Sequence, residues 1–169
     1  METQEIENKV ANSSIVSIDL ENYYLEGERV LFDIKYQLYE GIILKEKDFR
    51  LFLKEHNWHQ YQDKLVAIFC TEDAIIPTWA FMLLNVYLKP VAKKVVYGNI
   101  EQLEQEIWQD IISKIDFSIF EGQKVVIKGC GKKYIPNYAY SSFTLRLLDF
   151  AKSIMYGEPC STVPIYKKK

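Results

Sequence analysis

Three cysteines are the residues of this chain best suited to chemistry, and they stand far apart in the sequence. Cys70 ends an apolar run, Cys130 lies between Gly129 and Gly131, and Cys160 follows a proline near the end of the chain. Thiolates bind zinc and iron–sulfur clusters, and three of them leave a fourth coordination position open. If the fold brings the three together, they form a metal centre. Buried cysteines that pack as small apolar side chains are the alternative.

Cys130 has the sequence surroundings of a reactive thiol. The glycines beside it indicate a turn, and Lys132 and Lys133 follow directly. Positive charge next to a thiol favours the thiolate. The two lysines would offset thiolate charge at a metal centre, and they are candidates for binding an anion or a partner. Solvated lysines on a glycine turn are the alternative, and Cys130 acting alone as a nucleophile or sulfur carrier is a further hypothesis.

The elements that must position these cysteines form two similar stretches, residues 45–98 and 104–157. In each, an aromatic pair precedes an apolar run that ends in cysteine, at Lys64–Cys70 and Lys124–Cys130. A polar loop, an Ile-Pro pair, a helical segment and a closing Tyr-Gly follow in both. Proline marks a helix start, because the first helical N–H needs no partner within the helix. These shared landmarks favour duplication of one unit over chance similarity.

Each repeat is predicted to run helix, aromatic turn, strand, loop with cysteine, helix, strand. Strands that alternate with helices pair in parallel through right-handed crossovers. The runs 65–69 and 125–128 are largely apolar, which is typical of strands covered on both faces. Segments 15–20 and 29–32 resemble extra strands at an edge of the same sheet. The sequence therefore predicts an α/β fold with a three-layer, mostly parallel sheet, as a single domain over residues 1–169.

All three cysteines follow predicted strand ends. In open parallel sheets, ligands bind at the carboxyl ends of the strands, so we expect the thiols at one rim. Glu72 and Asp73 follow Cys70 and could supply a carboxylate pair, although loop and capping roles are favoured. No glycine-rich nucleotide-binding motif, nucleophile elbow or HExxH motif occurs. The common nucleotide-dependent and hydrolytic mechanisms therefore lack support.

The composition limits the classes of partner and indicates the cellular compartment. The 169 residues are 49% hydrophobic and 26% charged with a net charge of -2, which is ordinary globular usage. We expect no nucleic acid partner, because phosphate binding needs a concentrated basic face. Residues 1–14 lack the apolar region of a secretory signal, and the apolar stretch 74–88 is too short to span a bilayer. The sequence thus predicts a cytoplasmic protein with reduced thiols and no membrane partner.

Three motifs carry a resemblance to a known family. The run Lys152–Pro164, with Val126–Cys130 and Ile76–Ala80, resembles a bacterial family catalogued as domain of unknown function 2480. The resemblance covers nearly the whole chain. Genes of this family can lie beside iron–sulfur assembly genes, so the resemblance implies an accessory role with assembly proteins as partners. The repeated plan is also similar to quinolinate synthase, whose pseudo-symmetric units each present a cysteine to one cluster, although fold analogy does not establish function.

The leading functional hypothesis is therefore a cysteine-lined site for zinc or an iron–sulfur cluster. Its proposed ligands are Cys70, Cys130 and Cys160, with Lys132 and Lys133 beside them. A thiol-dependent enzyme or sulfur carrier that uses Cys130 is one alternative. A second alternative is a non-catalytic interaction module. The chain has twelve tyrosines, and a Tyr-rich surface could bind a partner protein.

Overall fold

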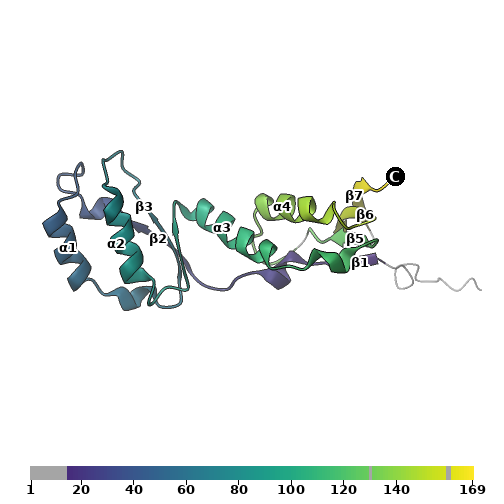
Figure 1. Cartoon of the computed structure of the whole chain (residues 1–169), viewed down its shortest axis with the longest axis horizontal. Coiled ribbons are helices and arrows are strands. Elements are labelled where there is room, and N and C mark those ends of the chain that lie inside the picture. Colours follow the sequence, from purple (N-terminus) through teal and green to yellow (C-terminus); the bar gives the residue numbers. More distant parts are fainter. Residues whose placement is uncertain (1–14, 130, 159–160) are drawn as a thin grey trace, which may run out of the picture. The chain divides into compact units, whose positions relative to one another are not determined.

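The computed structural model describes residues 15–129, 131–158 and 161–169 (Figure 1). Helices alternate with mostly parallel strands, so the predicted α/β class is confirmed. The chain forms two compact units. Unit 1 comprises Met1–Tyr24 and Trp108–Lys169, and unit 2 comprises Leu25–Ile107, so the second boundary falls inside helix α3 (Ile100–Ser113). Within the described ranges, no helix is long and apolar enough to cross a membrane.

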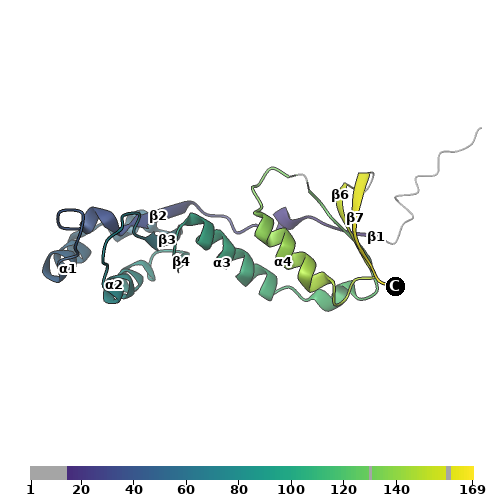
Figure 2. The same cartoon turned by 90° about the horizontal axis from the view of Figure 1, so that it is seen from above.

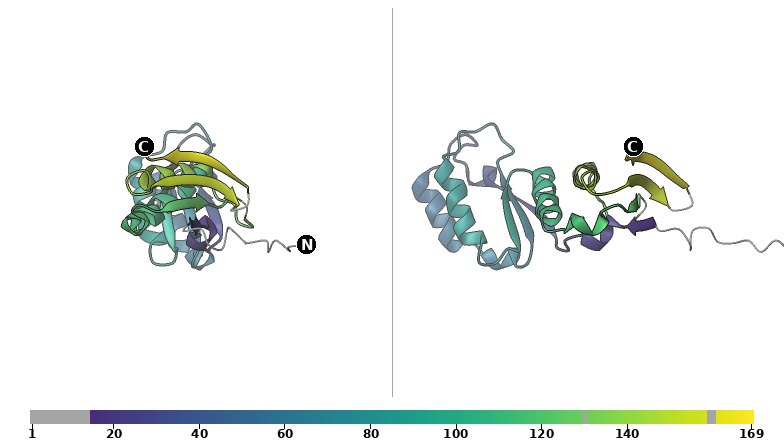
Figure 3. Two further views of the ribbon diagram at one scale, coloured as in Figure 1. Left: turned by 90° about the vertical axis from the view of Figure 1, so that its right-hand side faces the viewer. Right: turned by 45° about the vertical axis from the view of Figure 1, so that its right-hand side comes forward.

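Unit 2 holds a three-stranded parallel sheet of order β2-β3-β4. Its elements along the chain are β2 (Arg29–Asp33), the 3-10 helix Ile34–Gln37, α1 (Glu46–Glu55), the 3-10 helix Trp58–Tyr61, β3 (Leu65–Phe69), α2 (Thr78–Leu88) and β4 (Lys94–Tyr97). Helices α1 and α2 lie on one side of the sheet, and the first part of α3 lies on the other (Figure 3). The unit thus has three layers.

Burial of β3 on both of its faces explains these layers. Val66 and Ile68 pack with Phe49 of α1 and Leu84 of α2 in one buried cluster. Successive strand residues point to opposite faces, and Leu65 and Ala67 are buried as well. Both faces of the central strand are therefore covered, as its nearly continuous apolar sequence predicted.

Unit 1 holds a four-stranded sheet of order β1-β5-β6-β7. Its elements are β1 (Ile15–Ile18), the 3-10 helix Leu20–Tyr23, the end of α3, the 3-10 helix Phe117–Phe120, β5 (Lys124–Ile127), α4 (Asn137–Leu147), β6 (Ser153–Glu158) and β7 (Ser161–Lys167). Strands β1, β5 and β6 are parallel, and β7 is antiparallel to β6. Figure 2 shows α4 beside these strands. Trp108 of α3 and Phe143 of α4 pack with Val125 and Ile154 in the buried core.

The strands form two sheets, so the prediction of one sheet is wrong. Strand β1 pairs with β5, and β2 pairs with β3. Both are edge strands, as expected, but of different sheets. An apolar pattern identifies a strand and its buried face, but it does not identify the strand's partner. Each early strand completes the core of its own unit.

The first strand of each unit ends in the same way. Asp19 and Asp33 each precede a 3-10 helix, and each carboxylate accepts a hydrogen bond from the backbone N–H two residues ahead, of Glu21 and Lys35 respectively. The later elements also recur in the same order in the two units. All of unit 2 lies between the first 3-10 helix of unit 1 and the rest of that unit. Because of this insertion, the similar stretches at 45–98 and 104–157 leave out β1 and β2.

Candidate functional site

A polar cleft of about 260 Å³ opens in unit 1, where strands β1, β5 and β6 have their carboxyl ends. Its charged lining residues are Asp19 and Glu21 after β1, and Lys128 and Lys133 after β5. The carboxyl edge of a parallel sheet is where α/β proteins bind ligands, because loops and helix starts meet there. The cleft is therefore the first candidate for a functional site.

The two carboxylates of the cleft accept hydrogen bonds from backbone N–H groups. Asp19 Oδ1 accepts the N–H of Glu21 at 3.0 Å, and the Glu21 carboxylate accepts the N–H of Lys133. Asp19 Oδ2 also lies 3.9 Å from Lys128 Nζ, a distance at the limit of an ion pair. The Lys128 side chain is 36% exposed. Its ammonium group can therefore bind an anion that enters the cleft while Asp19 remains beside it.

Two glycines let side chains approach the loop after β5. A Cβ on Gly129 would lie 2.5 Å from the hydroxyl oxygen of Tyr156, and a Cβ on Gly131 would overlap the carboxylate of Glu21. No real Cβ tolerates such contacts, so any larger residue would force these neighbours to move. Because glycine has no side chain, both positions leave space for neighbouring side chains at the strand ends.

Two tyrosines border the cleft opposite the charged loops. The rings of Tyr140 on α4 and Tyr156 on β6 meet edge to face, with centroids 5.7 Å apart and planes at 88°. In unit 2 the equivalent rings, Phe81 and Tyr97, are 4.9 Å apart at 81°. The edge-to-face pair is thus common to both units. Tyr140 of unit 1 has a hydroxyl group, whereas the equivalent residue of unit 2, Phe81, has none.

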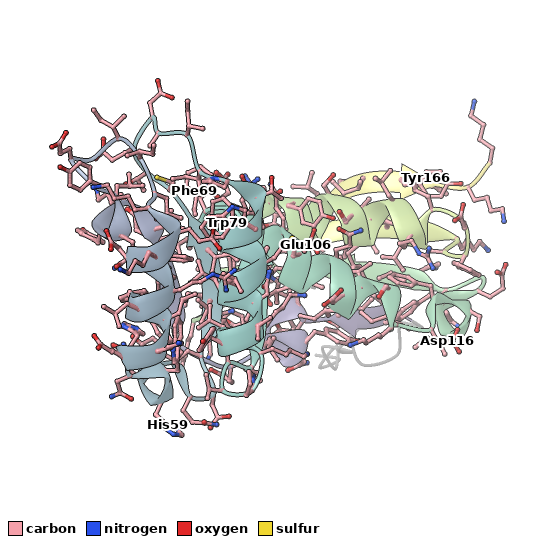
Figure 4. All side chains as sticks on the ribbon, turned by 60° about the vertical axis from the view of Figure 1, so that its left-hand side comes forward. His59, Phe69, Trp79, Glu106, Asp116 and Tyr166 are labelled. Carbon is pink, nitrogen blue, oxygen red and sulfur yellow. The ribbon has the colours of Figure 1, made fainter. Side chains whose placement is uncertain are left out.

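The same edge of unit 2 is filled by larger side chains. Phe69 and Cys70 stand where unit 1 has Lys128 and Gly129, because Ile68 pairs with Tyr97 as Ile127 pairs with Tyr156. Ile68 is fully buried, and the ring of Phe69 meets that of Tyr97 edge to face with centroids 6.4 Å apart. In Figure 4, Phe69 lies at the end of unit 2 opposite to His59. Unit 2 therefore places bulk at the positions that line the open cleft of unit 1.

Asp33 is bonded within this filled edge. Thr71 donates its hydroxyl to Asp33 Oδ2 at 2.5 Å and its N–H to Oδ1 at 3.2 Å. Burial alone would raise the pKa of Asp33, but these bonds, the Lys35 N–H and the Lys35 ammonium together hold that pKa below its usual value. Lys35 Nζ also lies 3.6 Å from a carboxylate oxygen of Glu72. The polar groups of this edge thus bind one another.

The structure places only part of the predicted cysteine site. Cys70 belongs to unit 2, where it is half-buried and packs against the apolar cluster of β3, α1 and α2. Cys130 and Cys160 lie outside the described residues. Among residues 15–129, 131–158 and 161–169, no three His, Cys, Asp or Glu side chains are grouped to hold a metal ion. The metal or iron–sulfur centre therefore stays a prediction.

The predicted lysines differ in their positions. Lys133 lines the cleft, and its ammonium lies 4.9 Å from the centroid of the Tyr24 ring. Lys132 is exposed on the same loop, and it does not line the cleft. The assignment of both to anion or partner binding remains a prediction, for which the position of Lys133 provides a specific place.

Sequence reasoning missed Asp19, Lys128, Tyr140 and Tyr156 as site residues. A position-by-position comparison of the repeats could have found Lys128, since a lysine stands there where the other repeat has Phe69 at the end of its apolar strand. Asp19 gave no such signal, because unit 2 separates it in sequence from the cleft residues that follow β5. The tyrosines resembled ordinary core aromatics until their place beside the cleft was known.

A family match spans almost the full chain. Residues 4–168 match the family described as Protein of unknown function (DUF2480), so the chain belongs to that family and the predicted resemblance is confirmed. Neither the comparison with curated proteins nor the comparison with solved structures gives a match.

Proposed function

We propose that this member of the DUF2480 family binds a small ligand with an oxyanion group in the cleft of unit 1. The observation that carries the proposal is the contrast between the two strand ends. Lys128 and Gly129 stand where unit 2 has Phe69 and Cys70, as the pairing of Ile127 with Tyr156 and of Ile68 with Tyr97 shows. These replacements remove bulk and add one cation at the edge where parallel sheets bind ligands. A purely structural edge would have no need of either change.

Several donors of the cleft suit a carboxylate or phosphate group. The Lys128 ammonium supplies a charged donor, and hydrogen bonds to charged groups are the stronger ones. Helix α4 begins at Asn137 in the cleft lining, and no side chain caps its first turn. The amide groups of a helix start favour negative charge and would add to the lysine. Asp19, beside Lys128, would orient the ammonium group.

Titration with small oxyanions tests this proposal. Backbone amide NMR spectra would be recorded with increasing acetate and inorganic phosphate for the wild type and for Lys128→Ile, which replaces the ammonium group with an apolar side chain. Losing a charged hydrogen bond costs about 1.5–3 kcal/mol, so we expect affinity to fall about tenfold to a hundredfold. Lys124→Ile is the matched control, because Lys124 is exposed at the amino end of the same strand.

The control and the variant must differ for the proposal to stand. We expect Lys124→Ile to bind both oxyanions as the wild type does. Equal affinity in Lys128→Ile and the wild type would reject Lys128 as the anion-binding group. Shifts centred on the strand ends of unit 2 would place the ligand elsewhere and reject the cleft.

A thiol centre is the second candidate function. Gly129 and Gly131, the chain neighbours of Cys130, line the cleft. Glu158 and Ser161, the residues that flank Pro159 and Cys160 in the chain, pair with each other at the carboxyl end of β6, next to β5 in the sheet. The ligands of this second candidate remain those predicted from the sequence, Cys70, Cys130 and Cys160, for zinc or an iron–sulfur cluster. With a cluster bound, the protein would serve iron–sulfur assembly in the reducing cytoplasm.

Metal and sulfide analysis after anaerobic purification tests the thiol centre. Loss of the metal in Cys130→Ser and Cys160→Ser but not in Cys70→Ser would support a centre confined to unit 1. Loss in all three variants would support the three-cysteine centre predicted from the sequence. A wild-type protein that holds neither zinc nor iron and sulfide in stoichiometric amounts would reject both.

A further inference from the structure

An apolar groove of about 290 Å³ adjoins the polar cleft in unit 1. Ser141, Thr144 and Leu145 of α4 form one wall, and Ile165 of β7 contributes to the other. Tyr140 and Tyr156 line the groove as well as the cleft. The two hollows are therefore neighbours that share one aromatic pair, and a ligand that fills the cleft could extend past that pair into the groove.

The side chains of the groove are those of a site for an apolar group. Leu145 is 64% exposed and Ile165 is 52% exposed, although both are large and apolar. Scattered exposed apolar residues need no explanation, but two that line one hollow next to a polar cleft indicate a binding surface. Among the described residues, none that lines the groove is a cation, since its other lining residues are Ile127, Ser141, Thr144 and the two tyrosines.

The groove depends on β7, which unit 2 lacks. In unit 2 the chain passes from β4 into α3, whereas in unit 1 it turns from β6 into the antiparallel β7. Only unit 1 therefore has a strand that can supply the wall formed by Ile165. The open cleft and the groove occur together, on the same unit.

The sizes of the two hollows also suit a single ligand. Small-molecule sites usually measure about 300–1,000 Å³. The cleft measures about 260 Å³ and the groove about 290 Å³, so each is slightly small by itself. Their combined volume lies within the usual range, and both are lined by Tyr140 and Tyr156. One ligand that occupies both is the simplest account of their sizes.

We propose that the ligand is an amphiphile, with an oxyanion head at Lys128 and an unbranched apolar chain in the groove. This inference rests on the proposed oxyanion site and adds the class of molecule that the site selects. Straight-chain carboxylic acids have this chemistry. The edge-to-face tyrosines lie where the head joins the chain, and their rings can contact the first methylene groups while their hydroxyls remain near the head.

Chain length is the variable that tests the amphiphile. The dissociation constants of acetate, butanoate, hexanoate, octanoate and decanoate would be measured by calorimetry below their micelle concentrations. Transfer of one methylene group from water to an apolar site is worth about 0.8 kcal/mol, so we expect affinity to rise about threefold to fourfold for each added methylene. The increase should stop once the chain fills the groove. Alcohols of equal length should bind more weakly than the acids.

A variant that fills the groove sharpens the test. Ser141→Trp places a large ring on the exposed face of α4 within the groove, and Met82→Trp is its control at the equivalent position of α2, which is 63% exposed. We expect decanoate to bind Ser141→Trp at least tenfold more weakly than the wild type, with acetate binding unchanged. Met82→Trp should bind both as the wild type does. Leu145→Ser, which removes an apolar wall without adding bulk, should also weaken decanoate binding.

The outcomes separate this inference from the proposal on which it rests. Acids that bind with equal affinity at every length, in the wild type and in Ser141→Trp, would overturn the amphiphile and leave the oxyanion site intact. Failure of every acid and of phosphate to bind would overturn both. Alcohols that bind as tightly as the acids would show that Lys128 contributes no affinity, and this would overturn the assignment of the head group.

Discussion

Units 1 and 2 share three parallel strands in the same order, with the same buried positions in α2 and α4, yet they differ where those strands end. Helices α2 and α4 bury side chains at equivalent positions, Ala80, Leu84 and Leu88 in one and Ala139, Phe143 and Leu147 in the other. The scaffold is thus maintained in both units. At the carboxyl edge, unit 2 has bulk and internal hydrogen bonds, whereas unit 1 has glycines, a lysine and open space.

This difference teaches where function can be sought in a protein with repeated units. Residues needed for packing remain similar because each core must be filled. Residues at a strand end contribute little to the core, so one unit can lose them and gain a site. The comparison of two units within one chain therefore replaces part of the information that a set of relatives would provide.

The largest predicted effect concerns the two cores. Phe143→Ala in unit 1 and Leu84→Ala in unit 2 remove fully buried side chains at equivalent positions. Such truncations cost about 2–5 kcal/mol of unfolding free energy, because they lose apolar burial and leave a cavity. Since the clusters share no residues, we expect each variant to lower amide hydrogen-exchange protection mainly in its own unit. An equal loss in both units after either change would contradict two separate cores.

The next effect concerns the open edge. Gly129→Phe adds an aromatic ring to the open strand end of unit 1 and forces Tyr156 to move. We expect it to abolish oxyanion binding and to cost about 1–3 kcal/mol, as overpacking usually does. Calorimetry and urea denaturation would measure the two effects. Binding at wild-type affinity in a folded Gly129→Phe protein would show that the glycine does not create the site.

A smaller effect concerns the bonded edge of unit 2 and its dependence on pH. The folded-state pKa of Asp33 is lowered, so its carboxylate stabilises the fold above the unfolded pKa, and this stabilisation is lost as pH falls through the folded pKa. We expect Asp33→Ala to cost about 1–3 kcal/mol at neutral pH. The difference from the wild type should shrink in acid, as measured by urea denaturation between pH 7 and pH 2. Asp73→Ala, on the next loop, is the control, and a difference independent of pH would contradict this account.

The smallest effect concerns the ion pair between Lys35 and Glu72. Its two groups are partly exposed and 3.6 Å apart, and such surface pairs contribute little to stability. We expect Glu72→Gln to leave the unfolding midpoint unchanged within the error of the measurement, at low and at high salt. A clear destabilisation that disappears with added salt would show that charge holds this edge together more strongly than we infer.

Local patterns predicted the elements well. The apolar runs, the Ile-Pro helix starts and the closing Tyr-Gly pairs lie at the strands, helices and turns of the structure, because these signals arise from neighbouring residues. The division of strands between two sheets was not predictable in this way. Ile18 and Phe32 belong to strands of similar pattern, and only long-range packing decides that one faces the core of unit 1 and the other the core of unit 2.

The candidate site was predicted only in part. The sequence predicted that the loop after β5, including Lys133, belongs to a site, because glycines and lysines beside a cysteine are a local signal. Lys133 does line the cleft. It could not assign Asp19 to the same place, since unit 2 lies between β1 and β5 in the chain. Tyr156 and the apolar groove were also missed, because β7 returns beside β6 through a pairing that strand propensity does not specify.

The most direct test of the central claim is a comparison of the two carboxyl edges in one experiment. Amide chemical shifts of the wild-type protein would be followed during titration with octanoate, with the strand ends of unit 2 as the internal control. The account predicts saturable shifts at residues 19–21, 128–129, 131–140 and 156, and none at residues 33–35 and 69–73. Equal shifts at both edges, or none at either, would contradict the claim that unit 1 alone carries the site.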